Sequence, residues 1–128
     1  MEDLKKNKQL VLKYFNAISA VKKEEEIIDQ YIDDDELKEH VLFFDTIFPN
    51  YELIADEMTA ESNRVIVLAR LKGKHEGEFN GIPPTYKKAE FKFAIGYFIQ
   101  KGKIVDHWMI ADQTTLMEQL GIYALVEE

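Results

Sequence analysis

The tryptophan Trp108 and the aspartate four positions after it, Asp112, form the pattern in this chain that most directly suggests acid–base chemistry. Alternation along a strand that begins near Lys103 puts both side chains on one face, so we expect them to look into one cavity. Desolvation there disfavours the charged carboxylate, and Asp112 would serve as general acid or base. Asp112 also precedes an expected helix, where aspartate commonly caps the first amides, and the residues alone favour that cap.

Aromatic and imidazole side chains elsewhere in the chain are candidates for binding a substrate in the same cavity. A phenol that faces a cavity can donate to a carbonyl, although Tyr14 and Tyr31 fit a half-exposed core equally well. His40 borders the apolar stripe of an expected helix, and Phe44 follows one turn later. His75 lies on an inward strand face but near its end, where a hydrogen-bonded rim histidine is the alternative. The predicted substrate-binding set is Trp108, Tyr14, Tyr31, His40, Phe44 and His75.

Several kinds of chemistry have no support in the pattern of residues. The three histidines are far apart in sequence, and the acidic run Asp33–Glu36 lacks the alternating ligands and glycine of a calcium loop, so we expect no metal. The chain has no cysteine, glycine-rich phosphate loop or serine elbow, so we expect no cofactor. His107 falls on the strand face opposite Trp108 and is expected at a surface or interface. Any catalysis would be acid–base.

Composition and charge limit the partners and the compartment. With 128 residues and 46% hydrophobic side chains, the chain is expected to form a single domain over residues 1–128. The net charge of −8 makes nucleic acid and anionic membranes unfavourable partners. Lysines interrupt the apolar residues of the first segment, Met1–Lys23, which therefore resembles neither a signal peptide nor a spanning helix. We expect a soluble cytoplasmic protein.

Helical periodicity in the first part of the chain gives way to strand periodicity in the second. Apolar residues recur at helical spacing over residues 3–21, 24–32 and 36–48, with Asp33 as a candidate cap of the third helix. From Tyr51 onward the period is two, with strands expected over 64–75, 86–100 and 103–110 and a hairpin turn at Lys101-Gly102. A short helix is expected over 115–120, ending at Gly121.

Helices followed by an antiparallel meander predict an α+β fold. A strand of about twelve residues is roughly 40 Å long, so the sheet must curl around the helices. The prediction is a cone-shaped, curled antiparallel sheet whose concave face is covered by the N-terminal helices. Such an arrangement encloses a largely apolar pocket, which suits a hydrophobic small molecule.

Three stretches of the sequence resemble the SnoaL-like polyketide cyclase and ester cyclase family. The first is Gly73–Thr85, which includes the loop Gly-Ile-Pro-Pro-Thr. The second is Gly102–Trp108 followed by Asp112, and the third is Leu116–Gly121; Phe48-Pro49 fits as well. The resemblance covers most of the chain from the first helix onward. The family usually has Gly-Arg or Gly-Lys after the Gly-Ile-Pro-Pro-Thr loop, where this chain has Tyr86-Lys87.

The resemblance implies the cone-shaped α+β barrel of the nuclear-transport-factor-like superfamily, usually dimeric through the outer face of the sheet. It implies ring closure by intramolecular aldol condensation without metal or organic cofactor, with an aspartate as acid–base catalyst. Asp112 matches that aspartate's place, which shifts the interpretation toward the cavity. Many relatives have a longer segment between the second and third helices, so the shorter connection here predicts a pocket mouth that is open or narrower.

Two functions are therefore carried forward. One is a cofactor-independent cyclase or isomerase that acts on a carbonyl compound through Asp112. The alternative is a non-catalytic ligand-binding or accessory dimeric module with the same fold. In either case a homodimer is expected, because apolar residues interrupt the charged outer face of the sheet. They are Ile66, Leu68, Ala94, Gly96 and Phe98.

Overall fold

Three helices form the first part of the chain in the computed structural model, which describes residues 2–121. They are α1 (Glu2–Ile18), α2 (Glu25–Asp29) and α3 (Asp35–Ile47). Residues 1 and 122–128 of the predicted domain lie outside the described range. The predicted first helix is three residues too long, because Ala20 has a φ of 60° and turns the chain toward the sheet. No helix among the described residues is both long and apolar enough to cross a membrane.

The capping pattern suggested Asp33 as the N-cap of α3, but the N-cap in the structure is Asp34. The Asp34 carboxylate accepts the Leu37 N–H at 3.2 Å. Asp33 is unsuited to the role because its own N–H donates to the Ile104 carbonyl at 2.7 Å, which holds it extended beside the last strand. The short connection between α2 and α3 is thus bound to the sheet.

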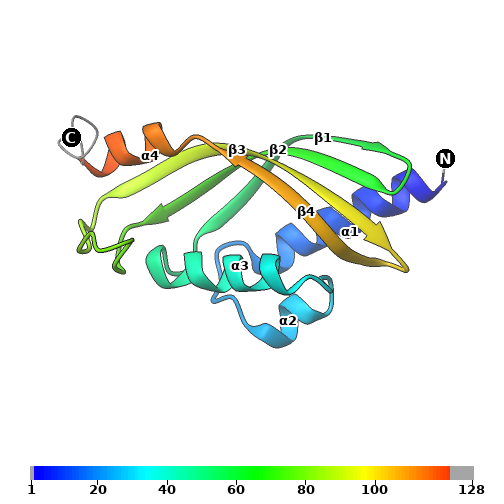
Figure 1. Cartoon of the computed structure of the whole chain (residues 1–128), viewed down its shortest axis with the longest axis horizontal. Helices are drawn as coiled ribbons and strands as arrows, with labels where there is room; N and C mark the ends of the chain where they lie inside the picture. Colours follow the sequence, from blue (N-terminus) through cyan, green and yellow to red (C-terminus); the bar gives the residue numbers. More distant parts are fainter. Residues whose placement is uncertain (1, 122–128) are drawn as a thin grey trace.

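Four antiparallel strands follow in a simple meander, β1 (Glu52–Glu61), β2 (Arg64–Lys74), β3 (Lys88–Gln100) and β4 (Lys103–Ala111). The sheet is curled and unclosed, and Figure 1 shows it arching over α1 and α3, with α4 (Gln113–Leu120) beyond one end beside β3. The predicted α+β architecture is confirmed. The odd-numbered residues of β2 and β3 face inward, as alternation indicated. Lys101 and Gly102 both have positive φ and form the hairpin turn to β4.

One extra residue in β4 reverses its alternation. Ile99 pairs with Ile104, but Phe98 pairs with Asp106, so Val105 has no partner and the strand contains a bulge. Beyond the bulge the odd residues face the interior with Tyr97, and the even residues face outward. The prediction that Trp108 points inward is therefore wrong, because alternation was counted without the bulge.

The outer face of the sheet has an apolar band across three strands. One row joins Ile66, Gly96 and Trp108, and the next joins Leu68, Ala94 and Ile110. Trp108 covers Gly96 so closely that a Cβ there would lie 2.3 Å from the indole. We call these two rows the outer band. The predicted outer apolar surface is present, and Trp108 and Ile110 extend it.

Candidate functional site

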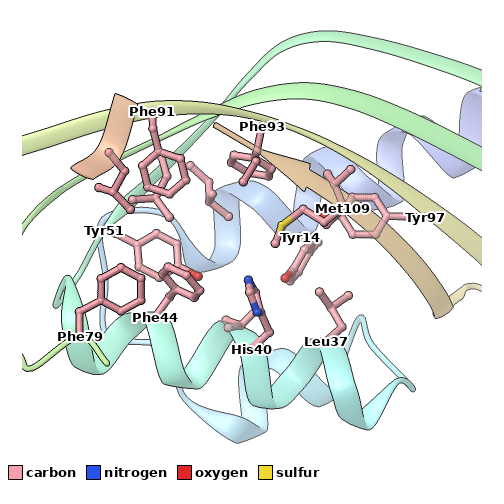
Figure 2. Close-up of a pocket in the computed structure, with 16 residues that line it drawn as sticks. Tyr14, Leu37, His40, Phe44, Tyr51, Phe79, Phe91, Phe93, Tyr97 and Met109 are labelled. Carbon is pink, nitrogen blue, oxygen red and sulfur yellow. The ribbon is translucent and has the colours of Figure 1, made fainter. Parts of the chain in front are cut away.

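A small cavity lies between the concave face of the sheet and α3. Its volume is about 80 Å³, and most of its walls are apolar side chains. Figure 2 shows α3 contributing Leu37, His40 and Phe44 from one side and the sheet contributing Phe91, Phe93 and Met109 from the other. Among the described residues, no aspartate, glutamate, lysine or arginine lines it. The cavity therefore suits an uncharged ligand.

Three tyrosines from distant parts of the chain line this cavity, namely Tyr14 on α1, Tyr51 before β1 and Tyr97 on β3. Each is at most 3% exposed, and none of their hydroxyls has a hydrogen-bond partner within residues 2–121. Burial raises the pKa of all three phenols well above their usual value, so they remain neutral donors. These hydroxyls are not among the buried side-chain atoms that lack a partner, so they open onto the cavity, where a ligand oxygen could accept from them.

The position of Tyr51 is set by a buried lysine. The Lys23 ammonium donates to the Tyr51 carbonyl at 2.8 Å and to the Val21 carbonyl at 2.7 Å, and it lies 4.0 Å from the centre of the Tyr51 ring. Asp45 is 3.6 Å from the same ammonium. Burial lowers the pKa of Lys23 to about 8, against the opposing effect of Asp45. These contacts fix the Tyr51 ring at the cavity wall.

His40 is the titratable group of α3 that lines the cavity. Its ring lies 4.6 Å from the Phe44 ring, between centroids, and Figure 2 shows its nitrogens in the same space as the Tyr14 hydroxyl. Burial lowers the pKa of His40, and the nearby His107 lowers it further while Glu36 opposes both. His40 is therefore a neutral imidazole at pH 7, which can accept a proton.

Asp112 and Trp108 lie outside the cavity. Asp112 is exposed and caps α4: its carboxylate accepts the Thr115 N–H at 3.0 Å and the Thr115 hydroxyl at 2.6 Å. These hydrogen bonds lower its pKa, which is the reverse of what a general acid needs. Trp108 is 37% exposed on the outer band. The expectation that both side chains face one cavity is wrong, because the bulge at Val105 turns the even-numbered residues that follow it to the outer face.

The remaining predicted residues divide between the cavity and its surroundings. His40, Phe44 and Tyr14 line the cavity, and their role in binding stays a prediction. Tyr31 stands behind the wall, with its ring 6.1 Å from that of Tyr14. His75 is fully buried away from the cavity and accepts the Thr85 N–H at Nδ1, which ties the last residue of the Gly-Ile-Pro-Pro-Thr loop to the end of β2.

The sequence analysis did not predict a polar cluster formed by Asp34 at the start of α3 with Asp106 and His107 on β4. His107, placed inward by the bulge, lies 2.7 Å from the Asp34 carboxylate through Nδ1. Asp34, Asp106 and His107 bring possible ligand atoms within 4.8 Å of one another, so they are the described group that could hold a metal ion. The Asp34–His107 hydrogen bond accounts for their proximity without one. His107 could have been assigned to the inner face only if the sequence had revealed the bulge in β4.

The sequence model of the SnoaL-like polyketide cyclases matches residues 12–120, which is most of the chain. The chain belongs to the SnoaL-like polyketide cyclase family. The resemblance in the sequence motifs is thereby confirmed. No curated protein matches the chain.

Solved structures share the fold of this SnoaL-like protein at low sequence identity. AclR, a candidate hydroxylase from Streptomyces galilaeus, is 21% identical with a TM-score of 0.80, covering 97% of this chain and 89% of its own. IdmH, a candidate polyketide cyclase from Streptomyces antibioticus, is 22% identical with a TM-score of 0.74, and the match covers 90% of this chain and 98% of IdmH. A candidate SnoaL-like polyketide cyclase from Jannaschia sp. CCS1 is 17% identical with a TM-score of 0.82, covering 94% of each chain. These similarities establish the fold.

The cap formed by Asp112 predicts a distinction between two substitutions. Asp112→Asn retains an N-cap side chain and should leave the melting temperature almost unchanged at pH 7, whereas Asp112→Ala should lower it measurably. Because the folded pKa of Asp112 is lowered, the wild-type advantage over Asp112→Ala should be present above the unfolded pKa and disappear as the pH falls through the folded pKa. Thermal melts over a range of pH measure both effects, and equal melting temperatures for the two variants would contradict the cap.

Proposed function

We propose that this SnoaL-like protein binds a small uncharged carbonyl compound in the cavity and exchanges a proton with it through His40. The observation that carries the proposal is the set of three phenols that line an apolar chamber and whose hydroxyls have no hydrogen-bond partner among residues 2–121. A carbonyl oxygen is an acceptor with two lone pairs and carries no charge, so it matches neutral donors in an apolar wall. Family membership supports the same class of ligand.

The volume of the cavity limits the part of the ligand that enters it. A protein cavity of roughly 150 Å³ holds one benzene molecule, whereas this cavity has about 80 Å³. A single ring therefore requires a modest movement of the wall. Met109 lines the cavity beside His40, and an unbranched thioether changes rotamer easily. We infer that one ring, or a fragment of that size from a larger molecule, occupies the site.

The chemistry follows from the two kinds of polar group. Neutral His40 can take a proton from the carbon next to the carbonyl, which leaves an enolate. The phenol hydroxyls of Tyr14, Tyr51 and Tyr97 can then donate to the enolate oxygen in a site of low dielectric. An enolate is the nucleophile of an aldol condensation, so this step is consistent with the ring closure that the family resemblance implies.

Non-catalytic binding is the second candidate function, and one observation favours it. The aspartate expected to transfer the proton is an exposed cap, and no other carboxylate lines the cavity among the described residues. A binding or accessory protein needs only the apolar walls and the phenol donors. Catalysis by Asp112 stays a prediction from the sequence alone, whereas the geometry supports His40.

We also propose that two copies of the chain associate through the outer band. Leu68 is 47% exposed and Ile110 is 69% exposed, and together with Trp108 they form apolar surface that association would cover. Charged residues border the band, with Arg70 and Lys92 along one side and Arg64 and Asp106 along the other. In an isologous dimer the band of one copy would pack against the same band of the other across a two-fold axis.

Binding should distinguish a ketone from a hydrocarbon of the same shape. Cyclohexanone should bind more tightly than methylenecyclohexane, since only the ketone satisfies the phenols. Tyr14→Phe and Tyr97→Phe should each weaken the binding of cyclohexanone by about 2- to 10-fold, the net value of one hydrogen bond, and leave the affinity for the hydrocarbon unchanged. The matched control is Tyr31→Phe, which lies outside the cavity. Ligand-observed NMR titrations give the affinities, and equal affinity for the two compounds would refute the donor role of the phenols.

Proton exchange tests catalysis without knowledge of the natural substrate. In D₂O the protein should accelerate exchange of the protons next to the cyclohexanone carbonyl, and His40→Gln should remove a factor of about 10²–10⁴. The rate should fall in acid, as His40 takes up a proton below its ordinary pKa of 6.5. Glu39→Gln, on the exposed side of the same helix, serves as control. If cyclohexanone binds tightly but its proton exchange is not accelerated, the catalytic proposal is wrong and the non-catalytic binding function is favoured.

The dimer can be tested with two leucines that are equally exposed. Leu68 in the outer band and Leu12 on α1 are both 47% exposed. Leu68→Glu should convert the protein to a monomer because two carboxylates would be buried at the interface, whereas Leu12→Glu should leave a dimer. Sedimentation equilibrium at micromolar concentration reports the mass. A wild-type species of only 15.0 kDa would contradict association.

A further inference from the structure

A buried ammonium group lies against one of the three cavity phenols. Lys23 is 3% exposed, and its ammonium is 4.0 Å from the centre of the Tyr51 ring. It also donates to the Tyr51 carbonyl at 2.8 Å and to the Val21 carbonyl at 2.7 Å. Both carbonyls are neutral, so these hydrogen bonds hold the ammonium in place without cancelling its charge. The positive charge therefore contacts a side chain of the cavity wall without lining the cavity itself.

The counter-charge is Asp45 on α3, whose carboxylate is 3.6 Å from the ammonium. The same carboxylate accepts the backbone N–H of Lys23 at 3.1 Å and that of Asn50 at 2.9 Å. Its negative charge is thus shared between two amides and the ammonium. Asp45 acts against the cation at Tyr51, because a nearby negative charge raises the pKa of that phenol. Removal of Lys23 and removal of Asp45 should therefore have opposite effects on Tyr51.

The other two phenols have no such neighbour. The rings of Tyr14 and Tyr97 pack edge to face with each other, with their centroids 6.1 Å apart. Among residues 2–121, no lysine or arginine lies over either ring. Tyr14 is also close enough to Tyr51 to affect its titration, but the Tyr14 phenol is neutral. Tyr51 is therefore the phenol of the cavity that is distinguished by a cation.

A positive charge on the face of a phenol ring strengthens the hydroxyl as a donor. The ammonium attracts the ring electrons, and the polarised ring draws electron density from its oxygen. The effect is larger in a buried site, where the dielectric is low. A neutral ketone gains little from it, whereas an enolate carries a full negative charge and gains more. An interaction that strengthens as the charge develops lowers the barrier to enolate formation.

We infer that Lys23 is a positioning residue that acts through Tyr51 to stabilise an anionic oxygen in the cavity. This role rests on the proposed function, in which proton transfer to His40 leaves an enolate. It singles out Tyr51 from the three phenols as the principal donor to the enolate oxygen. The reacting oxygen is thereby assigned to the Tyr51 side of the cavity.

The Tyr51 ring tests the influence of Lys23 in the free protein. Tyrosine labelled with carbon-13 at Cζ is followed by NMR from about pH 6 to about pH 9.5, with Tyr51→Phe identifying the signal. Burial lowers the pKa of Lys23 to about 8 and raises that of Tyr51 well above its usual value. The Tyr51 signal should therefore shift as Lys23 loses its proton, and Lys23→Met should abolish the shift. A Tyr51 signal that stays constant over this range would overturn the inference.

A phenol of one ring tests whether the charge acts on a ligand. The probe, 2,6-difluorophenol, ionises near neutral pH, and its phenolate has an anionic oxygen on a planar ring. Fluorine-19 shifts report the pH at which the bound probe ionises. In Lys23→Met this midpoint should lie about one pH unit or more above the wild-type value, because the cation is gone. Asp45→Asn should move it below the wild-type value, and Lys22→Met, at an exposed lysine, should leave it unchanged.

These measurements separate the role of Lys23 from the proposed function. Opposite shifts in Lys23→Met and Asp45→Asn cannot arise from a general loss of packing, since both variants disturb the same ion pair. Equal midpoints in the wild type and Lys23→Met would overturn the inference. If Lys23→Met does not fold, Asp45→Asn and the wild-type Tyr51 signal decide. Failure of the probe to bind would count against the proposed function, whereas the Tyr51 signal of the free protein would still decide whether Lys23 polarises the phenol.

Discussion

The single unpaired residue of β4, Val105, decides which side chains of that strand face the cavity and which face outward. A strand has a side-chain period of two, so one extra residue exchanges the inner and outer sets beyond it. In this protein the exchange brings His107 and Met109 to the concave side and sends Trp108 and Ile110 to the convex side. The inward position of His107 and the extension of the outer band by Trp108 and Ile110 are thus two results of one local insertion.

The cavity combines apolar walls with three phenol hydroxyls that have no hydrogen-bond partner among residues 2–121. Most buried polar atoms in proteins are hydrogen-bonded, and a hydroxyl left without a partner costs free energy on folding. Here Tyr14, Tyr51 and Tyr97 come from α1, the start of β1 and β3, so no local segment imposes their meeting. Lys23 holds one of them from behind through the backbone and the ring. An arrangement that tolerates this cost is expected at a binding site, where the ligand supplies the missing acceptor.

Asp112 illustrates that capping a helix and acting as a general acid or base place opposite demands on an aspartate. A carboxylate that accepts from a helix amide and a hydroxyl is stabilised in its charged form, and it becomes a poorer acid–base group at neutral pH. The same chemistry appears at Asp34, where one oxygen caps α3 and the other binds His107. Because Asp34 is largely buried and Asp112 is exposed, the two caps differ in what else they can influence. The partly buried cap is the one that lies beside the cavity.

Sequence patterns were sufficient for most of the elements, for the family and for three of the side chains that line the cavity, Tyr14, His40 and Phe44. Periodicity located the helices and the last three strands to within a few residues, and the odd faces of β2 and β3 followed from alternation because their odd positions are apolar, whereas their even positions mix charged and apolar residues. In β4 both parities are mixed, so Val105 leaves no local signal, and Trp108 and His107 were assigned to the wrong faces. At the start of α3 the capping pattern indicated Asp33, and the pairing of Asp33 with Ile104, which the sequence does not reveal, leaves Asp34 as the cap. Local hydrophobic pattern therefore determined which segments fold and which strand faces are buried, whereas the tertiary pairing of β4 and α3 decided which polar side chains meet, since that depends on register between distant segments.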